Sequence, residues 1–293
     1  MIDFPLIAGS FLVAIVVGLT GMGGGALMTP MMMLFFNVPP LAAVSSDLVA
    51  SAVMKPVGSA VHLRRGTVNL RLVGWLCVGS VPAAFCGVFI ARAFAVDDAV
   101  KYALGVALLL AVAGLVAKTL LAGKGGSSSA RDIVVRPIPT VLVGTVGGLI
   151  VGISSVGSGS LIIVALLALY PALKANELVG TDLVQAVPLV ASAALGHLLF
   201  GDFQLTLTVS LLIGSIPGVY LGARISSRAP GGLIRALLGI VLLASALKLL
   251  DVSNTVTVWA LAGAVLATVA GWRWRVRAAA RASSESRDLA RAR

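Results

Sequence analysis

The stretch "GLTGMGGGALMTP", Gly18 to Pro30, interrupts an apolar run with a cluster of glycines. A similar interruption, "GISSVGSGSLIIV", starts 134 positions later and runs from Gly152 to Val164. Glycine lacks the Cβ that restricts other residues, so such a cluster permits a sharp reversal of the chain. The two stretches therefore predict two hairpins, in each of which a pair of apolar segments meets at a glycine-rich tip.

The composition of the chain indicates a membrane protein. Of its 293 residues, 59% are hydrophobic and 11% are charged, and the mean hydropathy is +1.06. A soluble domain carries about 25% charged residues. The apolar runs recur along the chain and do not alternate apolar with polar residues, which favours membrane helices over a β-barrel.

The net charge of +11 does not indicate nucleic-acid binding. Many basic residues lie in short loops and in the tail from Arg273 to Arg293. This distribution is typical of the cytoplasmic segments of a bacterial inner-membrane protein. We therefore expect a multi-pass protein of that membrane, with a cytoplasmic C-terminus.

The apolar segments predict eleven helices, at 4–20, 26–36, 41–63, 70–91, 98–121, 138–153, 159–169, 176–199, 204–225, 232–250 and 255–272. Between the fifth and the sixth, "GKGGSSSARDIVVRP" has the composition of a flexible loop. The expected organisation is a first transmembrane repeat (1–121), a cytoplasmic linker (122–137), a second transmembrane repeat (138–250), an extra transmembrane helix (251–272) and a basic cytoplasmic tail (273–293).

The two halves of the chain match each other. The glycine clusters align at an offset of 134, and from Ser45 to Arg92 a single offset of 135 aligns the other shared positions. These are Ser46-Asp47 with Thr181-Asp182, His62 with His197, and "GSVP" (Gly79 to Pro82) with "GSIP" (Gly214 to Pro217). So many matched Gly, Pro, Asp and His residues indicate an internal duplication.

Arginines predict the orientation of the halves. Arg64 and Arg65 follow the segment 41–63, whereas the matching end "LLFGDF" has no basic residue, so the two ends should face opposite sides. Arg92 and Lys101 depart from this scheme. If each hairpin leaves on the side it entered, each half has one hairpin and three spans. The prediction is an all-α polytopic membrane protein of two inverted repeats with one extra C-terminal helix, an architecture common in secondary transporters.

The glycine clusters are the first candidate substrate site. Their backbone amides and hydroxyls could form an anion cradle where the tips meet, helped by the positive end of the following helix. The residues concerned are Gly21, Gly23, Gly24, Gly25, Ser154, Ser155, Gly157, Ser158 and Gly159. Close helix packing through small residues is the alternative. Neither cluster has the Gly-Lys-Ser/Thr ending of a nucleotide-phosphate loop.

Polar residues inside the apolar segments are the second candidate group, because ionisable side chains within a membrane are costly and usually functional. Asp47 and Asp182 could accept protons or orient substrate, with Ser46, Thr181 and Gln185 beside them, or they could cap helices near the interface. Lys55 could pair with Asp47 two turns earlier or raise the positive potential along an anion path.

The two histidines, His62 and His197, are expected at opposite membrane faces. Interfacial hydrogen bonding is one role for them, and paired gating or a proton relay is the other. The chain shows no metal-ligand spacing and no Ser/His/Asp set that this topology would bring together. We therefore expect no metal, no cofactor and no enzymatic activity.

The order and duplication of the quoted motifs resemble the sulfite exporter TauE/SafE family, also called toluene-sulfonate uptake permeases. The resemblance covers about residues 6 to 250 and includes "AAVSSDLVASAV", "LVGTDLVQAV" and the two segments that begin at His62 and His197. It implies a bacterial inner-membrane carrier for sulfite, sulfonates or related small organic anions.

The expected function is secondary transport of small anions, with a passive anion channel on the same fold as the alternative. The expected partners are the small anionic substrate and the lipid bilayer, without nucleic acid. The sequence leaves open whether the chain forms a homodimer, which anion it moves and in which direction.

Overall fold

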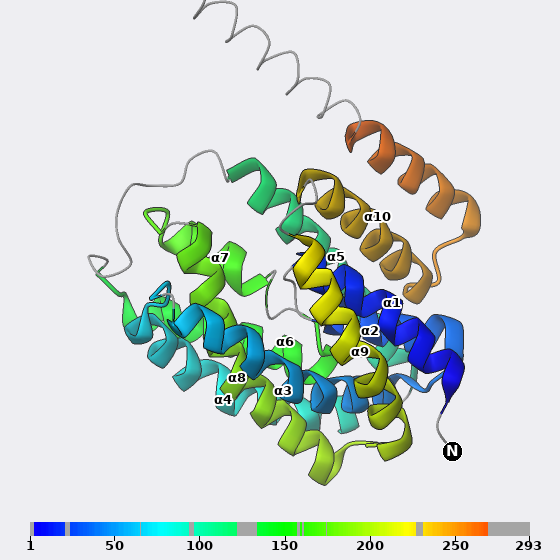
Figure 1. Ribbon diagram of the computed structural model, residues 1–293, viewed down its shortest axis with the longest axis horizontal. Helices are drawn as coiled ribbons and strands as arrows, with labels where there is room; N and C mark the ends of the chain where they lie inside the picture. The colour runs from blue at the N-terminus through cyan, green and yellow to red at the C-terminus, as the bar shows by residue number, and fades with distance from the viewer. Residues whose placement is uncertain are drawn as a thin grey trace, which may run out of the picture. The chain divides into compact units, whose positions relative to one another are not determined.

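The computed structural model describes residues 3–20, 24–64, 66–93, 97–121, 134–156, 159, 161–173, 175–226 and 231–268. Every regular element in these ranges is an α-helix (Figure 1). The first half contains α1 (Phe4–Thr20), α2 (Gly25–Phe36), α3 (Pro40–Arg64), α4 (Leu70–Ala93) and α5 (Asp97–Leu121). The second half contains α6 (Pro137–Ser154), α7 (Leu161–Leu169), α8 (Ala175–Phe200), α9 (Leu205–Ser226) and α10 (Gly231–Leu249). The all-helical fold is confirmed, and the helix ends agree with the predicted segments to within two residues.

The glycine clusters interrupt their apolar runs as predicted. In the first half, α2 begins at Gly25, and the carbonyl of Gly24 accepts hydrogen bonds from the N–H groups of Leu27 and Met28. In the second half, α6 ends at Ser154 because Ser155 adopts a left-handed conformation with φ of 59°. A residue in this conformation is a common helix terminator. Each cluster therefore separates two helices instead of lying inside one.

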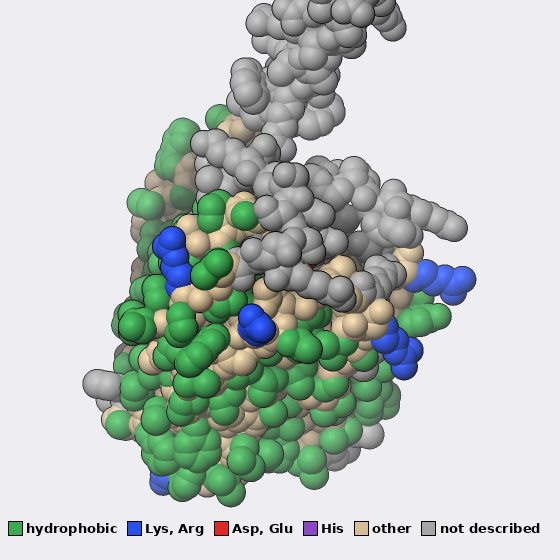
Figure 2. Space-filling model, turned by 90° about the vertical axis from the view of Figure 1, so that its left-hand side faces the viewer, with side chains coloured by type: hydrophobic (Ala, Val, Ile, Leu, Met, Phe, Trp, Pro, Cys, Tyr) green, Lys and Arg blue, Asp and Glu red, His purple; other side chains and the backbone are tan. Residues whose placement is uncertain are grey.

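The outer surface of the helices suits a lipid environment. Five of the described helices are long and apolar enough to cross a membrane: Leu70–Ala93, Ala99–Ala117, Pro137–Ser154, Glu177–Phe200 and Leu205–Gly222. Their outward faces carry large exposed apolar side chains, such as Leu142 and Tyr220, and exposed apolar surface of this kind is typical of membrane contact. On the face shown in Figure 2, hydrophobic side chains cover most of the described surface. A multi-pass membrane protein follows from these two observations.

Helices α3 and α8, which are equivalent in the duplication, pack against each other in antiparallel directions. The hydroxyl of Ser45, near the start of α3, lies 2.8 Å from Nδ1 of His197, near the end of α8. Further along α3, the Ser59 hydroxyl donates a 2.7 Å hydrogen bond to the carbonyl of Leu183, near the start of α8. In an inverted repeat, the equivalent helices of the two halves run in opposite directions. This pairing supports the inverted arrangement, which remains a prediction.

Matched glycines hold the halves together at two further crossings. A Cβ on Gly79 of α4 would overlap the Val141 carbonyl of α6, and a Cβ on its equivalent Gly214 of α9 would overlap the Ile7 carbonyl of α1. Only glycine permits such a close approach of two helix backbones. The repeated "GSVP" and "GSIP" motifs therefore mark the same helix contact, made once by each half with the other.

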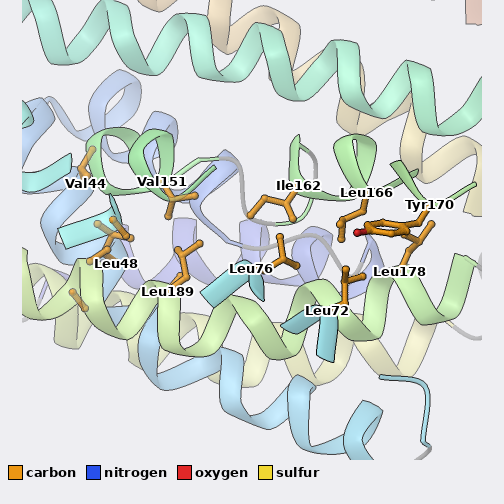
Figure 3. Packing of buried hydrophobic residues seen from close by; sticks show 14 of the residues in the cluster. Val44, Leu48, Leu72, Leu76, Val151, Ile162, Leu166, Tyr170, Leu178 and Leu189 are labelled. Atoms are coloured by element: carbon orange, nitrogen blue, oxygen red, sulfur yellow. The ribbon is translucent and has the colours of Figure 1, made fainter. Parts of the chain in front are cut away.

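The largest group of buried hydrophobic residues lies between the halves (Figure 3). It joins Leu72 and Leu76 of α4 to Ile162 and Leu166 of α7 and Leu189 of α8, all at most 1% exposed. The two halves thus share one core and do not form separate domains. The site described below lies in this shared interior.

The chain beyond Leu250 forms a second unit, which contains an apolar helix at Asn254–Thr268. This helix corresponds to most of the predicted segment 255–272. Residues 269–272, the predicted tail (273–293) and most of the predicted linker (122–133) lie outside the described residues.

The inverted arrangement predicts opposite sidedness for the ends of α3 and α8. Arg64 and Asp202 are both exposed and can each be replaced by cysteine, after Cys77 and Cys86 are changed to alanine. In sealed right-side-out vesicles, a membrane-impermeant maleimide should label a cysteine at position 202 and spare one at position 64. Labelling of both from the same side would contradict the inverted repeat.

Candidate substrate site at the hairpin tips

The two glycine-rich tips meet at Gly25 and Ser155. A Cβ on Gly25 would overlap the carbonyl oxygen of Ser155 and lie 2.6 Å from its hydroxyl oxygen, so no other residue fits without displacing the second tip. At Gly24, by contrast, a Cβ would make only ordinary contacts, 3.7 Å from the side chains of Met28 and Met54. Four of the predicted tip residues, Gly21, Gly23, Gly157 and Ser158, lie outside the described residues.

Asp47 of α3 binds both sides of this junction. The Ser155 hydroxyl donates a hydrogen bond to Asp47 Oδ2, and the Thr29 hydroxyl of α2 donates a second one, at 3.2 Å, to the same oxygen. The carboxylate is fully buried, and its other oxygen, Oδ1, has no hydrogen-bond partner among the described residues. Asp47 therefore connects α3 to α2 and to the tip that follows α6.

This geometry leaves the predicted anion cradle with fewer free donors and less positive charge than the sequence indicated. The Ser155 hydroxyl proton is already donated to Asp47, so an incoming anion can use it only after Asp47 releases it. The C-terminus of α6 and the N-terminus of α2 also meet here, and the partial charges of these opposite helix ends offset each other. The full charges around the junction then come from ionisable side chains.

Lys55 lies between two aspartates, Asp47 on its own helix and Asp182 on α8, and both carboxylates interact with it electrostatically. The antiparallel register of α3 and α8 gives the two axial separations. Asp182 lies beside the part of α3 near residue 60, about 7 Å along the axis from Lys55, whereas Asp47 lies about 12 Å away in the opposite direction. The sequence indicated Asp47 as the partner of Lys55, and the fold adds Asp182 from the other half.

The side chains of two other predicted residues, Gln185 and Thr181, hydrogen-bond to other segments of the chain, whereas that of Ser46 does not in the part that the structure describes. The Gln185 side-chain amide donates a 2.7 Å hydrogen bond to the hydroxyl of Ser80 on α4. The Thr181 hydroxyl accepts one from the backbone N–H of Asn69, in the connection between α3 and α4. Ser46, its equivalent, is fully buried, and its hydroxyl has no partner among the described residues. The two matched positions therefore have different surroundings.

The two histidines lie at opposite ends of the α3–α8 pair. His197 is fully buried, and its Nε2 donates a 2.8 Å hydrogen bond to the carbonyl of Gly152, in the last turn of α6. The carbonyl can only accept, so Nε2 carries the proton and Nδ1 contacts the Ser45 hydroxyl. His62 contacts the Thr67 hydroxyl at 3.0 Å. The geometry separates the two rings and gives each its own partners.

Sequence reasoning missed Thr29, Ser80 and Ser45, each of which contacts a predicted site residue. Signals for the first two were present, because Thr29 lies within the first glycine-rich stretch and Ser80 belongs to the duplicated "GSVP" motif. Ser45 could be found only from the register of α3 against α8. No group of three or more His, Cys, Asp or Glu side chains that could hold a metal occurs in the described part of the chain.

A duplicated, all-helical membrane protein with glycine-broken helices around a buried carboxylate has the architecture of a membrane transporter. The chain belongs to the sulfite exporter TauE/SafE family, whose sequence profile matches residues 6–249. Two similar proteins come from Bacillus subtilis (strain 168). "Probable membrane transporter protein YjnA" is 36% identical over 245 residues, or 81% of this chain and 96% of that protein. "Probable membrane transporter protein YdhB" is 26% identical over 223 residues, or 75% and 89% of the two chains. No solved structure matches the chain significantly.

Proposed function

We propose that this protein is a secondary transporter that moves small anions across the bacterial inner membrane, with its C-terminus in the cytoplasm. Sulfite, sulfonates and related sulfur-containing or organic anions are the first candidates, a choice that the name of the family supports. The observation that carries the proposal is the junction of the two glycine-rich tips, at Gly25 and Ser155, beside a fully buried carboxylate. Substrate sites of inverted-repeat transporters are typically formed by such broken helices.

The closed junction favours a carrier over a channel. The backbones of the two tips are in direct contact, so an ion cannot pass between Gly25 and Ser155 unless one tip moves. A movement that opens the junction alternately to each side is the step that defines a carrier. A passive anion channel on the same fold is the competing hypothesis.

The membrane potential sets the direction for an uncoupled anion. A negative interior favours export by about 2.3 kcal/mol per charge per 100 mV. Export therefore needs no additional ion, whereas import requires coupling to a cation. The family name describes an exporter, and the chain itself contains acidic side chains suited to coupling.

A flux panel tests the proposal. Purified protein is reconstituted into vesicles loaded with sulfite, methanesulfonate, acetate or phosphate, and uptake of the same labelled anion is followed. We expect saturable uptake of at least one sulfur-containing anion, and faster labelled uptake when the vesicles hold unlabelled anion. Flux that does not saturate and shows no counterflow would favour the channel. No flux of any anion, from protein that is folded by size-exclusion chromatography, would contradict anion transport.

A further inference from the structure

The unmatched oxygen of Asp47 is the feature that leads beyond anion transport. Oδ2 accepts two hydrogen bonds, from Thr29 and Ser155, whereas Oδ1 has none among the described residues, although the side chain is fully buried. A buried acceptor without a partner costs about 1–3 kcal/mol, and more when it is charged. Such a cost is expected at a position that binds something during function.

The charges around the junction do not balance. Asp47 and Asp182 each interact electrostatically with Lys55. When all three side chains are ionised, two carboxylates and one ammonium leave a net charge of one negative unit. The register of α3 against α8 places Asp182 nearer to Lys55 along the helix axis than Asp47 is, so we assign Lys55 to Asp182 and the excess negative charge to Asp47. An anion that enters this interior meets a like charge at low dielectric, where repulsion is strong.

A single proton on Asp47 resolves both problems. It makes the three side chains neutral as a group, and it turns Oδ1 from an unmatched acceptor into a hydrogen-bond donor. The described neighbours place no acceptor at Oδ1, but an oxyanion supplies one. Oδ2 can keep its bonds from Thr29 and Ser155 throughout, because it still has lone pairs to accept them.

We propose that Asp47 Oδ1 binds a proton together with the transported anion, so that the proton lies between the carboxyl oxygen and the anion. The inference rests on the proposed function and deepens it to proton–anion symport. The proton comes from water on the side where the anion enters, and it returns to water on the side where the anion leaves. Asp47 is thereby restored to its carboxylate form in each cycle.

Few titratable side chains lie on the helices around Asp47. Its own helix has Lys55, His62 and Arg64, and α2 and α6 have no ionisable side chain. The other helices that contact α3 supply the remaining titratable side chains that the structure describes: Glu177, Asp182 and His197 from α8, Tyr220 and Arg224 from α9, and Lys101 and Tyr102 from α5. Lys55 is the one described charge that interacts directly with Asp47. A pH dependence of anion binding that disappears with Asp47 is therefore assigned to Asp47.

The test measures anion binding against pH with the full chain in lipid nanodiscs. Methanesulfonate and toluene-sulfonate are the probes, because their charge stays constant between about pH 5 and pH 8, where carboxylate and histidine coupling is observed. In the unmodified protein, Kd should rise about tenfold per pH unit over the range in which the anion-free Asp47 is ionised. In Asp47→Asn, which mimics the protonated acid, binding should persist and become nearly independent of pH. Asp202→Asn, an exposed site with the same chemical change, should keep the full dependence.

A second measurement needs no variant. Binding enthalpies in buffers of different ionisation enthalpy report the protons taken up, and about one proton per anion is expected where Asp47 starts ionised. No proton uptake together with pH-independent binding would overturn the symport proposal and leave anion transport standing. Equal pH dependence in Asp47→Asn and the parent would overturn the assignment to Asp47. Absence of binding by either probe at every pH would count against the proposed function and the symport inference together.

Discussion

Replacing Gly25 by alanine is expected to reduce anion flux by about tenfold or more. The added Cβ overlaps the carbonyl of Ser155, so the two tips must separate and the hydrogen bond from Ser155 to Asp47 is strained or lost. Overpacking of this kind costs about 1–3 kcal/mol, and 1.4 kcal/mol corresponds to a factor of ten in an equilibrium. Counterflow of labelled methanesulfonate in vesicles, normalised to folded protein, measures the effect.

The adjacent glycine provides the matched control. Gly24→Ala keeps the backbone amide, and its Cβ meets Met28 and Met54 at an ordinary 3.7 Å, so most of the flux should remain. Normal flux in folded Gly25→Ala would show that the contact between the tips is not on the transport path. Equal losses at both positions would indicate a general effect of reduced glycine flexibility instead of the specific contact with Ser155.

Replacing Gly79 by alanine should destabilise the protein, although alanine is the better helix former. The gain in helix propensity is at most about 1 kcal/mol. The new Cβ overlaps the Val141 carbonyl of α6, which is part of a backbone and cannot rotate away, so an overpacking cost of about 1–3 kcal/mol should exceed the gain. Gly214→Ala should behave alike, because it meets the Ile7 carbonyl of α1 in the equivalent crossing.

The control for this pair lies on the same helix. A Cβ on Gly74 of α4 has nothing within 4 Å, so Gly74→Ala should be neutral or stabilising. Thermal unfolding in detergent, followed by loss of the monodisperse species, gives the order of stability. A Gly79→Ala variant as stable as Gly74→Ala would mean that α4 and α6 do not approach as closely as the backbone contact indicates.

The helices themselves were predictable from the sequence. Long apolar runs separated by glycine, proline and charged residues define them, and the ends of α1, α3 and α8 were placed to within one residue. The break near Ser155 was predictable too, because a serine- and glycine-rich cluster between two apolar runs permits a sharp reversal of the chain. Local composition decides these features, and it is fully present in the sequence.

The candidate site was predictable only in part. The duplication drew attention to Asp47, Asp182 and the glycine clusters, and the fold brings Asp47 to Gly25 and Ser155 as neighbours. The duplication did not indicate that Asp182 is a second partner of Lys55, because that depends on the register of α3 against α8. It also treated the matched histidines alike, although His197 bridges Ser45 of α3 and the Gly152 carbonyl of α6, whereas His62 contacts Thr67.

The amino-acid sequence alone specifies a duplicated set of membrane helices with two glycine-rich interruptions and a few polar residues that are costly to bury. Those properties follow from hydropathy, glycine content and the match between the halves, all of which are local or periodic. Helix packing sets which oxygen of Asp47 accepts hydrogen bonds, which half of the chain supplies each partner, and which glycines contact another helix backbone. Several of these contacts join residues far apart in the chain, such as Asp47 and Ser155, which are 108 positions apart, and the packing of helices that fixes them has no signature in the local sequence.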